Sequence, residues 1–151
     1  MTARGFLLAA EDAEDLEIVS AHLQDAVGRI KDFAYLPKKR RFAAILNRFK
    51  WEKSERGRTG GNVRVQSGLH FDAVLSVKSK NLKQGAPDAV VSLLAIKFSS
   101  KASDDPAGTI ELMFAGGGTI RLEVECIDGG IQDMSGEWAA RGRPVHELGE
   151  S

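Results

Sequence analysis

The stretch Thr109-Ile-Glu-Leu-Met-Phe-Ala-Gly-Gly-Gly-Thr-Ile-Arg-Leu-Glu-Val-Glu-Cys-Ile127 contains two runs in which apolar and polar residues alternate. On the second run Ile120, Leu122 and Val124 fall on one side, with charged residues between them. A period of two is typical of a half-buried β-strand. Three glycines, residues 116–118, separate the runs, and glycine accepts the positive φ angles that a tight reversal needs. The stretch therefore predicts a β-hairpin.

Near the N-terminus the apolar period changes to that of a helix. Asp12 is a good N-terminal cap, and the acidic residues around it favour the positive end of a helix dipole. Apolar residues then recur at spacings of three and four, at Leu16, Val19, Leu23, Ala26 and Val27. We expect a helix over residues 12–27, with Gly28 as its C-terminal cap.

The remaining apolar runs predict extended structure. The expected strands are a short first one at residues 5–9, then 30–36, 41–51, 63–65, 69–79 and 90–98, in addition to the two arms of the hairpin. The strand from Arg41 is apolar on both sides as far as Leu46, as in a strand that is covered on two faces. Beyond Leu46 polar residues enter, so we expect this half to emerge at a surface. The run at 90–98 is the most continuously apolar and should be central in the sheet.

Together these elements predict one α+β domain over residues 1–151, with a loosely ordered tail at residues 141–151. The domain would contain one main N-terminal helix and six to eight mostly antiparallel strands. Two architectures fit this set, an open sheet with the helix on one face or a curled split barrel, for which a pleckstrin-homology-like fold is one form. Residues 131–134 fit either a turn of helix or a short strand.

Composition excludes several classes of protein. Apolar residues make up 42% of the chain and charged residues 28%, which is typical of a globular domain. No apolar run approaches the roughly 20 residues of a membrane-spanning helix. Acidic residues begin at Glu11, where a signal peptide would still be apolar, and the single Cys126 has no partner for a disulfide within the chain. We expect a cytoplasmic protein with no membrane association, in which Cys126 is a buried strand residue.

The net charge of zero conceals a strong asymmetry along the chain. Residues 1–37 carry a net charge of −4, residues 38–64 carry +8, residues 65–103 carry +3 and residues 104–151 carry −7. The basic middle could form a surface that attracts an anionic partner, or it could pair with the acidic ends in the folded protein. The sequence leaves both possibilities open.

The basic segment supplies the candidate binding residues. Positive and aromatic side chains are interleaved there, at Arg48, Lys50, Trp51, Lys53, Arg56, Arg58 and Arg64. Our leading hypothesis is a non-enzymatic binding or interaction domain that uses this basic strand and loop, with an acidic protein as one possible partner. The alternative is a protein that binds single-stranded RNA or DNA, with Trp51 and Phe49 as stacking platforms. A monomer and a homodimer both fit the sequence.

No motif predicts a catalytic residue, a metal site or a cofactor. The three histidines are 48 and 76 residues apart, which is no metal-ligand spacing, and the glycines at 116–118 precede a strand rather than a helix. A third hypothesis is an enzyme whose site is assembled by the fold from distant groups such as His70, Asp72 and His146.

Four segments carry a resemblance to a known family. They are Ala10-Glu-Asp-Ala-Glu-Asp-Leu16, His22-Leu-Gln-Asp-Ala26, Leu46-Asn-Arg-Phe-Lys-Trp-Glu52 and Phe114-Ala-Gly-Gly-Gly-Thr-Ile120. Through them the chain resembles, over nearly its whole length, a family of small alphaproteobacterial proteins classed as domain of unknown function 2948. The resemblance implies a bacterial cytoplasmic protein and transfers no catalytic or binding residue.

Overall fold

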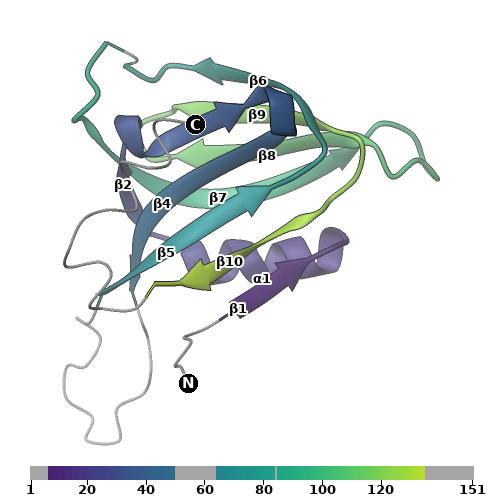
Figure 1. Ribbon diagram of the computed structural model, residues 1–151, viewed down its shortest axis with the longest axis horizontal. Coiled ribbons are helices and arrows are strands. Elements are labelled where there is room, and N and C mark those ends of the chain that lie inside the picture. Colours follow the sequence, from purple (N-terminus) through teal and green to yellow (C-terminus); the bar gives the residue numbers. More distant parts are fainter. Residues whose placement is uncertain (1–6, 50–63, 84, 135–151) are drawn as a thin grey trace, which may run out of the picture.

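The computed structural model describes residues 7–49, 64–83 and 85–134 (Figure 1). Residues 50–63 of the basic segment and the predicted tail at 141–151 lie outside these residues. The described elements are β1 (Leu7–Ala10), α1 (Ala13–Leu23), β2 (Val27–Arg29), the 3₁₀ turn η1 (Ile30–Asp32), β3 (Phe33–Leu36), the 3₁₀ turn η2 (Pro37–Lys39), β4 (Arg41–Phe49), β5 (Arg64–Phe71), β6 (Val74–Lys80), β7 (Val90–Ser100), β8 (Gly108–Phe114), β9 (Thr119–Val124) and β10 (Gly129–Asp133).

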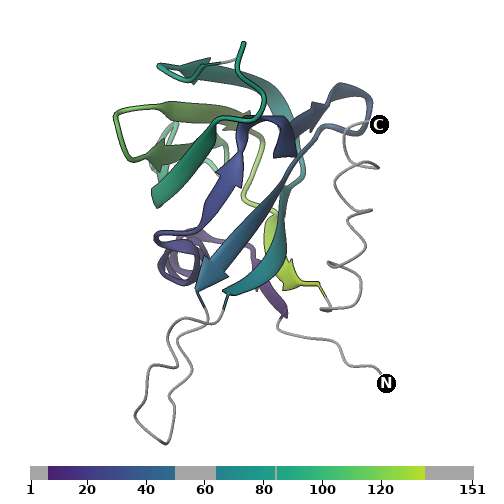
Figure 2. The same cartoon turned by 90° about the vertical axis from the view of Figure 1, so that its left-hand side faces the viewer.

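The ten strands form one antiparallel sheet that curls without closing. Its order is β1-β10-β5-β4-β2-β7-β8-β9-β6, and β3 pairs with β4 beside this path. Figures 1 and 2 show the curl, with α1 at its lower end. The described part is thus α+β and mostly antiparallel, as predicted, but it has ten strands where six to eight were expected.

Helix α1 begins as predicted and ends earlier than predicted. The Asp12 side chain accepts a hydrogen bond from the backbone N–H of Asp15 at 2.8 Å, so the predicted cap is confirmed. Leu16, Val19 and Leu23 are buried against the core. The helix stops at Leu23 because Asp25 adopts a left-handed conformation, with φ of 69°, and its N–H donates to the carbonyl of Leu93.

Gly28, predicted as the helix cap, lies within strand β2 instead. A Cβ atom at Gly28 would lie 2.9 Å from the Leu46 side chain and 3.1 Å from the carbonyl oxygen of Ile45. The close approach of β2 to β4 therefore favours a residue without a side chain at this position. The predicted strand at 30–36 is interrupted as well, because residues 30–32 form the turn η1 and only Phe33–Leu36 is extended.

Strand β4 is covered on two faces, as its sequence indicates. All five residues from Phe42 to Leu46 are buried, and β5 pairs with β4 along its full length, from Phe42 opposite Phe71 to Phe49 opposite Arg64. The expectation that the second half emerges at a surface is wrong for Arg48, which is only 6% exposed.

Strand β7 connects the part of the sheet that ends with β2 to the part formed by β8, β9 and β6. Its first residues pair with β2 and its remaining length pairs with β8, with an irregularity between Leu93 and Ala95. The backbone N–H of Ile96 donates to the Ser20 hydroxyl of α1 at 2.9 Å, so the helix satisfies a donor near this irregularity. The central position predicted for this strand is confirmed.

The glycine hairpin and its surroundings follow the predicted pattern with two corrections. Gly116 and Gly117 have φ of 89° and 96°, and β8 pairs with β9.

The predicted strand at 69–79 is divided at Ala73, where φ is 60°. Cys126 lies after the end of β9 and is half-buried rather than fully enclosed. Residues 131–134 belong to a strand as far as Asp133.

Gly129 lies where strand β10 packs closely against strand β5. A Cβ atom there would collide with the carbonyl oxygen of His70 and lie 2.6 Å from the Phe71 ring, whereas a Cβ at Gly85 would meet nothing within 4 Å. We expect Gly129→Ala to lower the free energy of unfolding by about 1–3 kcal/mol, as overpacking does. Gly85→Ala is the matched control and should stay close to the wild type in urea denaturation. Equal stability of the two variants would contradict this packing.

Candidate functional site

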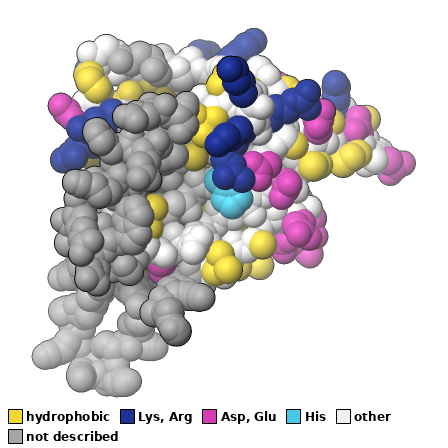
Figure 3. Space-filling view, in the orientation of Figure 1, with side chains coloured by type: hydrophobic (Ala, Val, Ile, Leu, Met, Phe, Trp, Pro, Cys, Tyr) yellow, Lys and Arg dark blue, Asp and Glu magenta, His cyan; other side chains and the backbone are white. Residues whose placement is uncertain are grey.

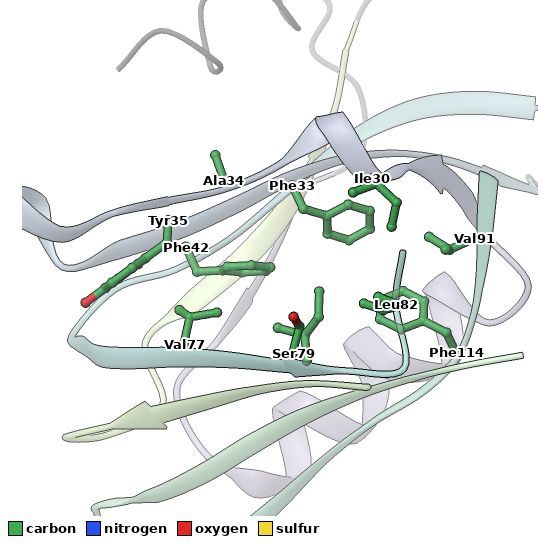
Figure 4. Close-up of a pocket in the computed structure, with 11 residues that line it drawn as sticks. Ile30, Phe33, Ala34, Tyr35, Phe42, Val77, Ser79, Leu82, Val91 and Phe114 are labelled. Atoms are coloured by element: carbon green, nitrogen blue, oxygen red, sulfur yellow. The ribbon is translucent and has the colours of Figure 1, made fainter. Parts of the chain in front are cut away.

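An apolar pocket opens between strands β3 and β6, and we call it the β3–β6 pocket (Figure 4). It has a volume of about 290 Å³, near the lower end of the range for small-molecule sites. The lining residues come from η1, β3, β4, β6, the turn after β6, and the strands β7, β8 and β9: Ile30, Phe33, Ala34, Tyr35, Phe42, Val77, Ser79, Leu82, Val91, Phe114 and Ile120.

The pocket exists because two strands diverge without pairing with each other. β3 pairs with β4, β6 pairs with β9, and in the described part of the chain no strand pairs with the other edge of either. At one end the two strands are joined. The Tyr35 hydroxyl donates to the carbonyl of Val74 at 2.8 Å, and the N–H of Val74 donates to the carbonyl of Arg40 at 2.9 Å. Away from this junction the strands separate and the pocket begins.

Aromatic rings form the inner wall of the pocket. The Phe33 ring lies edge-on to Phe114, with centroids 5.7 Å apart, and 6.4 Å from the Phe42 ring. Such tilted and edge-to-face pairs are favourable, and each ring restrains its neighbours. Figure 4 shows the Phe33 and Phe42 rings on one side of the pocket and Val77 on the other, with the Phe114 ring beside Leu82. The site is therefore apolar, with hydroxyl groups from Ser79 and Tyr35 at its edge.

Of the seven predicted binding residues, the structure describes two. Lys50, Trp51, Lys53, Arg56 and Arg58 lie outside the described residues. Arg64 is exposed at the start of β5, and its guanidinium lies 4.8 Å from the centroid of the Phe49 ring, within the range of a cation–π contact. A basic side chain and an aromatic ring of the predicted surface are therefore adjacent.

Arg48 occupies the interior side of β4 and takes part in a buried ion pair. Its Nε and Nη2 atoms donate to the two carboxylate oxygens of Asp133 at 3.0 and 2.8 Å, and Ser67 donates to the same carboxylate at 2.7 Å. The side chains of Arg48 and Asp133 are 7% and 8% exposed. Arg48 therefore joins β4 to β10 inside the fold and presents little surface to a partner.

Part of the basic middle of the chain pairs with the acidic C-terminal part in the folded protein. Arg48 and Arg40, from the basic segment, pair with Asp133 and Glu125, from the acidic C-terminal part of the chain. The Arg40–Glu125 pair is exposed, with 3.3 Å between its charged atoms. Among the described residues, pairing of the basic segment with the acidic C-terminal part thus uses Arg40 and Arg48.

Two of the three residues of the predicted assembled enzyme site lie close together. His70 Nε2 is 3.9 Å from Asp72 Oδ2, while His146 lies outside the described residues. Arg41 donates two hydrogen bonds to Asp72, at 2.7 and 3.3 Å, and this contact holds the pKa of the Asp72 carboxyl below its ordinary value. Burial first, and then the charge of Arg41, lowers the pKa of His70. The cluster is an ion-pair network at the surface.

Nowhere in residues 7–49, 64–83 and 85–134 do three His, Cys, Asp or Glu side chains lie close enough to hold a metal ion. Within the same ranges, no helix has the length and apolar character needed to cross a membrane.

From the sequence, most of the pocket residues were predicted only to belong to strands, with no indication that they line a pocket. Tyr35 and Phe42 are opposite each other in the β3–β4 register, so an antiparallel pairing of the two runs would place both rings on one face. Leu82 could also have been noticed in the sequence, because it is an isolated apolar residue in a polar turn. In the structure it packs against the core. The pairing of Arg48 with Asp133 joins residues 85 positions apart and has no local signal.

Comparison with known families places the chain in a defined group. Residues 6–146 match the model of the family described as "Protein of unknown function (DUF2948)". The chain belongs to this family, which confirms the resemblance drawn from its sequence. Neither the curated proteins nor the solved structures contain a match.

The Arg48–Asp133 pair predicts a large effect of removing one partner. Asp133→Ala leaves the Arg48 charge buried without its carboxylate, and we expect a loss of about 3–5 kcal/mol in the free energy of unfolding. The double variant Arg48→Met/Asp133→Leu removes both charges, so its loss should be smaller than that of Asp133→Ala. Urea denaturation measures both. If the double variant were less stable than Asp133→Ala, the buried charge of Arg48 would not be the main cause of the loss of stability.

His70 predicts a dependence of stability on pH. Because its pKa in the folded protein is below the ordinary value of 6.5, the unfolded chain binds its proton first as the pH falls. The free energy of unfolding should therefore decrease between pH 7.5 and 5.5, and His70→Gln should decrease less steeply. Titration of other groups affects both proteins and cancels in the difference. Parallel profiles from urea denaturation across this range would exclude the effect.

Proposed function

We propose that the protein is a non-enzymatic binding domain that holds a small, mostly apolar molecule in the β3–β6 pocket. The observation that carries the proposal is the pocket itself, an aromatic-lined opening between two strands that do not pair. Small-molecule sites are usually concave, largely apolar and supplied with a few polar groups, and this pocket has that composition.

The position of the pocket supports a binding role over a simple packing defect. Tilted aromatic contacts of Phe33 with Phe42 and Phe114 hold its inner wall in place. Tyr35 uses its hydroxyl to fix β3 against β6 at the closed end. A ligand would therefore enter a largely preformed site, which reduces the entropy lost on binding.

A second candidate function rests on the basic segment. The contact of Arg64 with Phe49 combines a positive charge with an aromatic face, as proteins that bind single-stranded nucleic acids do. An acidic protein is the other partner that such a surface would suit. We keep this surface as a proposal for Lys50, Trp51, Lys53, Arg56, Arg58 and Arg64. A pleckstrin-homology-like fold and a bacterial cytoplasmic location also stay predictions.

The pocket can be tested with the neutral fluorescent probe N-phenyl-1-naphthylamine, whose emission rises in apolar surroundings. We expect saturable binding to the wild type and at least about tenfold weaker binding to Val77→Phe, which fills the pocket. Leu75→Phe is the matched control, because Leu75 is on the same strand, is 49% exposed and does not line the pocket.

Three outcomes of this experiment are informative. Loss of binding in Val77→Phe alone supports the pocket, provided that circular dichroism shows both variants folded. Equal binding to all three proteins, or no binding to the wild type, would overturn it. Salt-sensitive quenching of tryptophan emission by single-stranded RNA or DNA, with no binding of the neutral probe, would instead favour the basic surface.

A further inference from the structure

Strand β6 ends the described sheet on one side, and its outer edge faces the gap between β6 and β3. It pairs with β9, and no strand of the described residues pairs with its other edge. An edge strand directs a row of backbone N–H and C=O groups away from its neighbour, and an extended peptide can pair with such a row. The backbone of β6 is therefore a template for one more strand.

The two faces of β6 differ in their chemistry. Val77 lines the β3–β6 pocket and is opposite the buried Leu122 of β9. Because side chains alternate along a strand, Lys78 and Lys80 lie on the opposite, exposed face. Figure 3 shows Lys and Arg side chains along the upper edge of the molecule, where Figure 1 places β6. A strand added beside β6 thus has an apolar surrounding on one face and a basic neighbour on the other.

On the exposed face, charges alternate from strand to strand until they reach β6. Lys97 of β7 is opposite Glu111 of β8, and Glu111 is opposite Arg121 of β9, with which it forms an ion pair at 3.4 Å. Arg121 is in turn opposite Lys78, and like charges in this position are unfavourable. In the part of the chain that the structure describes, neither Lys78 nor Lys80 forms an ion pair. An acidic residue on the free side of Lys78 would restore the alternation.

We propose that β6 binds an extended segment of a partner protein as an additional strand, in which apolar residues alternate with Asp or Glu. The apolar residues enter the β3–β6 pocket, whose volume of about 290 Å³ accommodates aliphatic side chains. The acidic residues lie beside Lys78 and Lys80 on the exposed face. These lysines also disfavour pairing with a second copy of the chain, since lysines would then meet lysines.

This inference goes beyond the proposed function, because the ligand is a protein segment held by backbone pairing rather than a small molecule. A dye-labelled peptide of sequence Gly-Glu-Val-Glu-Leu-Glu-Val-Gly is the probe, and its matched control has Lys in place of each Glu. In fluorescence anisotropy at low salt we expect the acidic peptide to bind saturably and at least about tenfold more tightly than the basic one. The difference should shrink as salt screens the charges.

Backbone pairing is tested separately by N-methylation of the acidic peptide. In an extended strand the N–H groups of alternate residues point to the same edge, so one peptide is methylated at its Val and Leu residues and another at its Glu residues. We expect at least one of them to bind about tenfold or more weakly, because methylation removes the donors that face β6. Unchanged binding of both methylated peptides would overturn strand pairing.

Charge-reversing variants locate the peptide on β6. Lys78→Glu/Lys80→Glu should weaken binding of the acidic peptide at least about tenfold and strengthen binding of the basic peptide. Lys97→Glu/Lys101→Glu is the matched control, because it makes the same change of charge on β7 and just after it, three strands and roughly 14 Å away across the sheet. Equal effects of the two variants, both shown to be folded by circular dichroism, would overturn the proposal.

The outcomes also distinguish this inference from the proposed function. Binding of the neutral probe N-phenyl-1-naphthylamine without binding of the acidic peptide would overturn the strand partner and leave the apolar pocket. Binding of the peptide without binding of the neutral probe would support the strand partner and overturn the small-molecule ligand. Self-association of the protein that excludes the peptide, measured by analytical ultracentrifugation, would assign the edge to a second copy and overturn this inference.

Discussion

Backbone pairing along β4 determines the shape of the molecule. One edge of β4 is paired with β5 over its whole length, and the other edge is shared between β2 and β3. The turn η1 separates these two partners, and its N–H groups at Ile30 and Lys31 donate to carbonyls of Ala89 and Pro87. Because carbonyls outside the sheet accept from these two N–H groups, the chain can leave one alignment and enter another while both backbone donors stay paired.

This division of β4 has a direct consequence for the pocket. β2 continues the sheet toward β7, whereas β3 remains beside β4, and no strand of the described residues pairs with its other edge. The curl of the sheet then brings β6 opposite β3, and the bond from Tyr35 to Val74 joins them at one end. The pocket is thus a product of sheet topology. Its rings are supplied by residues that also belong to the hydrophobic core, such as Phe42 and Phe114.

The sequence predicted those elements whose signals are local. The Asp12 cap and the glycine hairpin depend on residues within a few positions of each other, and both form as expected. Features that depend on distant strands were missed. Helix α1 ends early because Asp25 and Ala26 bond to Leu93, and a strand far along the chain has no influence on a local periodicity. The same limit applies to Arg48, whose partner Asp133 is fixed only once β10 joins the sheet beside β5.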